Sequence, residues 1–66
     1  MQMTRSERIN ERLKNLSLGE SVQMSLYGKE AVRLLARGYD VDDLGVAIPM
    51  SGMHRYKVTK LLISDQ

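Results

Sequence analysis

The sequence predicts an α+β fold, in which an N-terminal helix is followed by a strand, a second helix and a β-hairpin that form a small antiparallel sheet. Three observations support this prediction. Apolar side chains recur with helical spacing in residues 4–16, polar and apolar side chains alternate in residues 21–26, and Gly52 lies where a hairpin turn would separate two strands. The chain has 66 residues, the size of one small domain, so we expect residues 1–66 to form a single unit.

The first helix is expected over about residues 4–16. Thr4 and Glu7 have the spacing of a capping box, in which both side chains accept hydrogen bonds from backbone N–H groups at the helix start. Three apolar residues follow at helical spacing: Ile9, Leu13 and Leu16. Three arginines form a basic stripe beside them: Arg5, Arg8 and Arg12. The helix is therefore amphipathic, and residues 17–21 form the turn after it.

A strand and a second helix are expected next. The strict alternation in residues 21–26 places Val22, Met24 and Leu26 on the buried side of a strand, which Gly28 ends. The helix is expected over Lys29–Arg37, with Gly38 just beyond its last residue. Its buried face comprises Ala31, Val32, Leu34 and Leu35. Its outer face carries a second basic stripe: Lys29, Arg33 and Arg37.

The last third of the chain is favoured as a β-hairpin. A three-residue loop over residues 50–52, with Gly52 in the left-handed conformation, is a common hairpin connection. It pairs Val46 with Tyr56, Ile48 with His54 and Leu44 with Val58 on one face of the sheet. The opposite face then holds Arg55, Lys57, Thr59 and Ala47. This register separates apolar from basic side chains, as a correct register should.

An all-α alternative is a helix-turn-helix. Residues 34–48 resemble the first half of such a motif, because Gly38 would end one helix and an aspartate would begin the next. Residues 57–62 likewise resemble the back of a recognition helix. Against this, the turn between the halves is about three residues too long for the motif. Pro49 also replaces the usual turn glycine, and Arg55 occupies an apolar position, so we favour the hairpin.

The layout also resembles small phage-encoded α+β proteins. The resemblance is carried by residues 16–22, a short basic helix and the closing segment of residues 55–61. It implies a strand–helix–hairpin plan and a regulatory protein that binds DNA or a host protein.

Composition limits the other possibilities. The chain has no cysteine, which excludes disulfides and thiolate metal sites, and its one histidine, His54, is expected to be structural, so we expect no cofactor and no metal. No apolar run approaches the roughly 20 residues that span a bilayer, and the N-terminus lacks a signal-peptide pattern, so we expect a cytoplasmic protein without membrane contact. A domain this small has a marginal core, and we expect a homodimer or a partner to add stability.

The charged residues predict a nucleic-acid-binding protein. A third basic stripe comprises Arg55, Lys57 and Lys60. Three such stripes are typical of phosphate contacts, although each one alone is also typical of a solvated surface. Asp40, Asp42 and Asp43 interrupt the basic segments, and we expect them to cap a helix or to repel other anions.

We therefore expect a transcription regulator directed at DNA, and no enzyme, because no catalytic motif is present. The alternative is a protein–protein interaction module that inhibits or modulates a host enzyme such as RNA polymerase. One continuous basic surface would favour nucleic acid, whereas scattered stripes around an exposed apolar groove would favour a protein partner.

Overall fold

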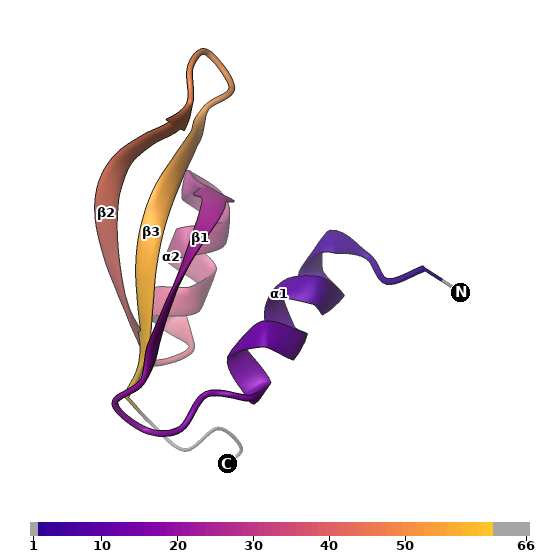
Figure 1. Cartoon of the computed structure of the whole chain (residues 1–66), viewed down its shortest axis with the longest axis vertical. Coiled ribbons are helices and arrows are strands. Elements are labelled where there is room, and N and C mark those ends of the chain that lie inside the picture. The colour runs from indigo at the N-terminus through magenta and orange to yellow at the C-terminus, as the bar shows by residue number, and fades with distance from the viewer. Residues whose placement is uncertain (1, 62–66) are drawn as a thin grey trace.

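The computed structural model describes residues 2–61 and contains two helices and a three-stranded antiparallel sheet (Figure 1). The elements follow one another as α1 (Arg5–Lys14), β1 (Ser21–Tyr27), α2 (Gly28–Ala36), β2 (Tyr39–Ile48) and β3 (Met53–Lys60). The predicted α+β class is confirmed. The helix-turn-helix alternative is wrong, because residues 39–48 and 53–60 are strands; Leu62, in its predicted recognition helix, lies outside the described residues.

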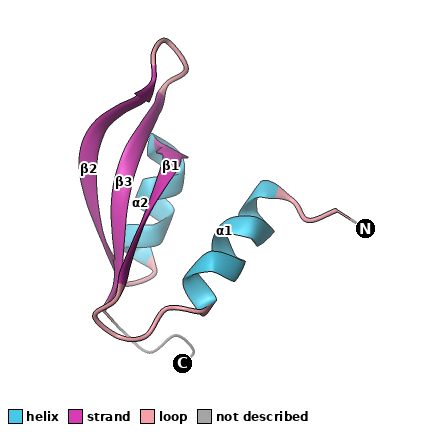
Figure 2. Ribbon diagram, in the orientation of Figure 1, coloured by secondary structure: helices cyan, strands magenta, loops and turns pink. Residues whose placement is uncertain are grey.

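The last strand of the chain, β3, lies in the centre of the sheet. The strand order is β1-β3-β2, and both outer strands pair antiparallel with β3. β1 and β2 therefore run in the same direction, and α2 connects them across one face of the sheet (Figure 2). The other face has no helix in front of it in this view, and we call it the open face. α1 lies beside β1 (Figure 1).

Capping residues mark the start of α1 and the end of α2. Thr4 Oγ1 accepts a hydrogen bond from the Glu7 amide at 3.2 Å, and Glu7 Oε1 accepts from the Thr4 amide at 2.8 Å, so the predicted capping box is confirmed. At the end of α2, Gly38 has a φ of +98°, a backbone conformation that favours glycine. The predicted helix boundaries are thus correct to within about two residues.

The core lies between the sheet and the two helices. Its buried residues are Leu13, Met24, Leu26, Leu34, Tyr39 and Val58. On α2, Ala31 and Leu34 are buried as predicted, whereas Val32 and Leu35 are 64% and 53% exposed. The prediction of four buried positions was wrong for these two, because a helix lying on a sheet of three short strands buries only a narrow part of its surface.

The predicted hairpin exists, but the predicted register is wrong. Val41, and not Leu44, lies opposite Val58, and Val46 lies opposite His54. Two shifts in the pairing, between Asp43 and Gly45 and between Val46 and Ile48, each insert one extra residue into β2. These bulges bend β2, and they break the regular alternation on which the prediction rested.

The hairpin loop is one residue longer than predicted and covers residues 49–52. The Ser51 hydroxyl donates to the Ile48 carbonyl at 2.6 Å and accepts from the Met53 amide at 3.0 Å. Gly52 has a φ of +81°, which confirms the left-handed conformation predicted for it. Met50 also has a positive φ, of 64°, which is uncommon for a residue with a side chain.

Candidate functional site

The strand pairing defines four rows of side chains across the open face. A residue and its antiparallel partner project to the same side of a sheet, and successive residues alternate. Starting from the hairpin end, the rows in the order β1–β3–β2 are Tyr27–Met53–Ile48, Ser25–Arg55–Gly45, Gln23–Lys57–Asp42 and Ser21–Thr59–Asp40. The open face therefore changes from largely apolar at the hairpin end to polar and charged at the other.

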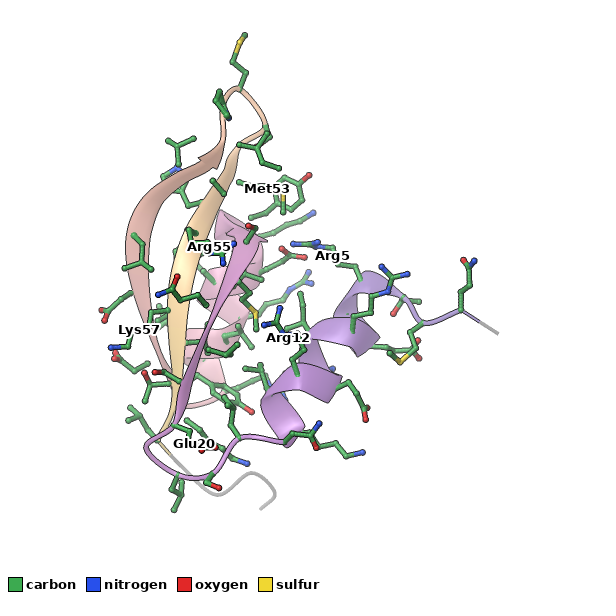
Figure 3. The ribbon with its side chains drawn as sticks, viewed as in Figure 1. Arg5, Arg12, Glu20, Met53, Arg55 and Lys57 are labelled. Atoms are coloured by element: carbon green, nitrogen blue, oxygen red, sulfur yellow. The ribbon has the colours of Figure 1, made fainter. Side chains whose placement is uncertain are left out.

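Arg55 and Lys57 lie in the middle of the open face (Figure 3). Both side chains are exposed, and within residues 2–61 neither makes an ion pair or a side-chain hydrogen bond. Their neighbours on β1 are the uncharged Ser25 and Gln23. The prediction that Arg55 and Lys57 share one face with Thr59 is confirmed, whereas Ala47 falls at a bulge.

The aspartates of residues 40–43 belong to strand β2, so the expected helix-capping role is wrong. Asp42 lies directly opposite Lys57, and Asp40 lies opposite Thr59. Both carboxylates are exposed, and they form an acidic border along one side of the open face. Directly opposite residues in a sheet have their Cβ atoms about 5 Å apart, so the charge of Asp42 partly cancels that of Lys57.

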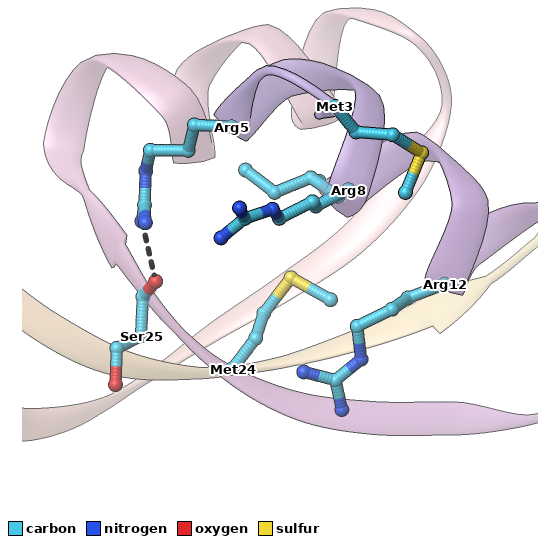
Figure 4. A pocket seen from close by; sticks show the side chains of 7 residues that line it. Met3, Arg5, Arg8, Arg12, Met24 and Ser25 are labelled. Carbon is cyan, nitrogen blue, oxygen red and sulfur yellow. Dashed lines mark hydrogen bonds between the residues drawn. The ribbon is translucent and has the colours of Figure 1, made fainter. Parts of the chain in front are cut away.

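On the other side of β1, three arginines of α1 line a groove (Figure 4). The groove has a volume of about 500 Å³, and its walls also include Met3, Ile9, Met24 and Ser25. Arg5 donates from Nη2 to the Ser25 carbonyl at 2.8 Å, and Arg12 donates from Nη2 to the Gln23 carbonyl at 3.4 Å. Arg8 extends into the groove and has no ion pair or hydrogen bond from its side chain within the described chain.

Arg5 connects three elements and is committed to the structure. Its Nε atom lies 2.7 Å from Glu30 Oε2, and its guanidinium carbon lies 5.5 Å from the centre of the Tyr27 ring. The hydrogen bond from Arg5 lowers the pKa of the Glu30 carboxyl below its ordinary value, and the Tyr27 amide, which donates to the same carboxylate, adds to this effect. The same hydrogen bond raises the pKa of Arg5. This guanidinium therefore fastens α1 to β1 and α2.

The basic residues of α2 (Lys29, Arg33 and Arg37) and Lys60 do not lie on the open face. Arg33 and Arg37 line a separate hollow of about 120 Å³ between α1 and α2. Arg37 donates to Asn10 Oδ1 at 2.7 Å and lies over the Tyr39 ring, and Lys60 donates to the Leu16 carbonyl at 3.0 Å. Lys29, the first member of the stripe, is exposed on α2. The three predicted stripes therefore lie on three different surfaces and do not form the single continuous basic surface that would favour nucleic acid, although Arg8 and Arg12 lie on one side of β1 and Arg55 and Lys57 on the other.

The hairpin carries an exposed apolar surface, which we call the apolar hairpin surface. It comprises Leu44, Val46, Ile48 and Met50, of which Val46 shares the row of His54 on the helix-covered face and Ile48 shares the row of Met53 on the open face. Near it, the Nδ1 atom of His54 lies 2.9 Å from both carboxylate oxygens of Asp43, and its ring stacks on Tyr56. The Gly45 amide and then His54 lower the pKa of the Asp43 carboxyl. His54 thus has the contacts of the structural residue that the sequence predicts.

Gln23, Ser25 and Tyr27 belong to the open face although the sequence did not single them out as site residues. They share the open face with Arg55 and Lys57 and separate these residues from the arginines of α1. The alternation of residues 21–26 already placed Gln23 and Ser25 opposite Met24, so the signal for these two was present in the sequence. What the sequence lacked was the identity of the neighbouring strand.

Metal binding and membrane insertion are two further possibilities for the described residues. Within residues 2–61, no three His, Cys, Asp or Glu side chains lie close enough together to hold a metal ion, and no helix is long and apolar enough to cross a membrane. Comparison of the chain with protein-family models, with curated proteins and with solved structures found no match. Its function is therefore inferred from its own geometry.

Proposed function

We propose that the chain is a nucleic-acid-binding protein, without catalytic activity, that binds the phosphate backbone along the β1 edge of the sheet. The binding surface runs around the β1 edge of the sheet, with Arg8 and Arg12 on the Met24 side of β1 and Gln23, Ser25, Arg55 and Lys57 on the open face. The observation that carries the proposal is that free or weakly engaged cations from two elements, α1 and β3, flank the uncharged strand residues Gln23 and Ser25. A regulatory role at DNA is the biological setting that we expect for it.

The internal contacts decide which basic residues take part. Arg5, Arg37 and Lys60 donate to groups within the protein at 2.7–3.0 Å, so binding a phosphate would break those hydrogen bonds, whereas the contact of Arg12 with the Gln23 carbonyl is longer, at 3.4 Å. Lys29 and Arg33 lie on α2, on the other side of the sheet. Arg8, Arg12, Arg55 and Lys57 remain, and each adds about one unit of salt dependence when it neutralises a phosphate.

The test is a comparison of two double variants that remove the same amount of charge. Arg55→Ala with Lys57→Ala should weaken binding to a labelled oligonucleotide and flatten the dependence on salt by about one unit for each phosphate that is no longer neutralised. Lys29→Ala with Arg33→Ala removes two exposed charges from α2 and should change the affinity by less than about twofold. An equal weakening in both variants would indicate attraction by net charge alone, and unchanged affinity in the first would rule out the proposed face.

The apolar hairpin surface favours a second function. Exposed apolar side chains concentrated at one end of a hairpin are typical of protein–protein contacts. In this alternative the hairpin docks on a host enzyme such as RNA polymerase, and the acidic residues of β2 contact basic groups of that partner. Val46→Ser with Ile48→Ser should then abolish the inhibition or modulation of the enzyme and leave oligonucleotide binding unchanged. Loss of oligonucleotide binding in this variant would argue against separate surfaces.

A further inference from the structure

We infer that the nucleic acid bound on this face is single-stranded. The inference rests on the proposed function and adds to it the class of ligand. It follows from three features of the open face: the acidic border on β2, the spacing of the strands, and the row that contains the exposed Tyr27 and the half-buried Met53.

The acidic border opposes a duplex. Neighbouring strands lie about 4.8 Å apart, and the major groove of B-DNA is about 12 Å wide between its two phosphate backbones. If β3 enters such a groove, the backbones lie about 6 Å to either side of it. One backbone then lies near β1 and the α1 arginines, and the other lies over Asp40 and Asp42.

A single strand avoids this repulsion. One phosphate backbone can follow β1, between the arginines that line the α1 groove and Arg55 and Lys57 on β3. On this path Arg55 and Lys57 are one strand away, whereas Asp40 and Asp42 are two strands away. At physiological ionic strength charges are screened over about 8 Å. One strand spacing, about 4.8 Å, is shorter than this screening length, whereas two spacings, about 9.6 Å, exceed it, so the phosphates on β1 are attracted by the β3 cations more strongly than they are repelled by the aspartates.

The hairpin end of the open face offers a surface for bases. Tyr27 and Met53 are direct neighbours on this face, and Tyr27 is 39% exposed. The Arg5 guanidinium lies over the Tyr27 ring and restrains it. A base that is not paired can stack on such a ring, whereas the bases of a duplex are stacked on one another and present only their edges. The phosphate path along β1 leads to this position.

The test uses a short labelled single strand of mixed sequence, as DNA and as RNA, and the duplexes formed by annealing each to its complement. The single strand should bind about tenfold more tightly than the duplex at low salt, because the duplex places phosphates over the acidic border. Asp40→Asn with Asp42→Asn should lower the ratio of single-strand to duplex affinity by about fivefold. Removing two negative charges strengthens binding to both probes, so the ratio of the two affinities, and not either affinity alone, is the decisive quantity.

The contribution of Tyr27 is measured with two variants. Tyr27→Leu should weaken single-strand binding by about tenfold through the loss of stacking, whereas Tyr27→Phe keeps the ring and should retain the affinity of the unchanged chain. Circular dichroism confirms that both variants are folded.

The outcomes separate this inference from the proposed function. If duplex binds as tightly as the single strand, and the aspartate variant leaves the ratio unchanged, the single-strand inference is wrong. The proposed function still stands in that case, provided that Arg55→Ala with Lys57→Ala weakens duplex binding. If neither probe binds at low salt, both are wrong.

Discussion

The two edges of the sheet are protected in different ways. Along β1, the helix α1 lies beside the strand, and Arg5 and Arg12 donate to the outward carbonyls of Ser25 and Gln23. Along β2, the strand itself carries two bulges and three aspartates. Coverage by another element, bulges and charged side chains are all known means of preventing an edge strand from pairing with another chain.

The difference shows how each kind of protection affects the regularity of its strand. α1, the element just before it in the chain, covers the outer side of β1, and β1 keeps an unbroken pairing with β3 from Ser21 to Tyr27. The bulges of β2 shift its pairing twice and leave Leu44, Val46 and Ile48 about half exposed or more. The edge at β1 is protected by contacts with α1, whereas the edge at β2 is protected by the bulges and charges of the strand itself.

The largest effect is expected where α1 meets the β1 edge. Leu13 is fully buried and is the only core residue that α1 contributes among the described residues. Leu13→Ala should therefore lower the free energy of unfolding by about 2–5 kcal/mol. Val46→Ala, at the bulged edge, should change it by less than about 0.5 kcal/mol. Urea denaturation measures both, and similar decreases would show that the two edges contribute equally to stability.

A smaller decrease in stability is expected at the end of the hairpin. A β-branched side chain is poorly tolerated at the positive φ of Gly52, so Gly52→Val should cost at least about 1 kcal/mol. Asparagine adopts this conformation more readily, and Gly52→Asn should cost less. Thermal unfolding of the two variants checks the order, and a neutral valine variant would contradict the turn conformation.

The ion pair between Arg5 and Glu30 should make the covered edge sensitive to acid. The pKa of Glu30 is below its ordinary value of 4.5 in the folded chain, so the pair stabilises the fold above pH 4.5. This contribution is lost as the pH falls through the lower, folded-state pKa. Arg5 is partly exposed, so the effect should be under about 1 kcal/mol.

Glu30→Gln should remove that part of the acid dependence, whereas Glu11→Gln, on the outer face of α1, should keep it. Denaturation midpoints measured between neutral and acidic pH provide the comparison. An identical pH profile for Glu30→Gln and the unchanged chain would show that the pair contributes nothing.

The smallest effect on the isolated chain is expected from the apolar hairpin surface. We expect self-association through it, because a core of this size is marginal. Sedimentation at micromolar concentration should show a mass that rises with concentration, and Val46→Ser with Ile48→Ser should reduce this rise while changing the stability of the single chain by less than about 0.5 kcal/mol. A constant species of 7.5 kDa would contradict the expectation.

The sequence was sufficient for elements whose boundaries depend on local chemistry. The capping box at Thr4, the alternation in residues 21–26 and the turn glycine Gly52 each act within a few residues, and each was predicted. The bulges in β2 could not be predicted in the same way, because an alternating pattern contains no information about where the partner strand is shifted.

The candidate site was predicted in part for the same reason. The sequence placed Arg55 and Lys57 on one face and grouped Arg5, Arg8 and Arg12 on another element. It did not indicate that β1 lies between these groups, because strand order is a property of the whole fold. Nor did it indicate that Arg5, Arg37 and Lys60 bind groups of the protein itself.

The central position of β3 has a consequence for synthesis of the chain. β1 and β2 pair only with β3, and β3 is the last of the three strands in the sequence. No strand of this sheet has a neighbour to pair with until residues 53–60 have emerged from the ribosome. Domains generally fold as units once their sequence is available. For as long as translation of this segment takes, both edge strands are therefore unpaired, and binding by a chaperone or cleavage by a protease competes with folding during that interval.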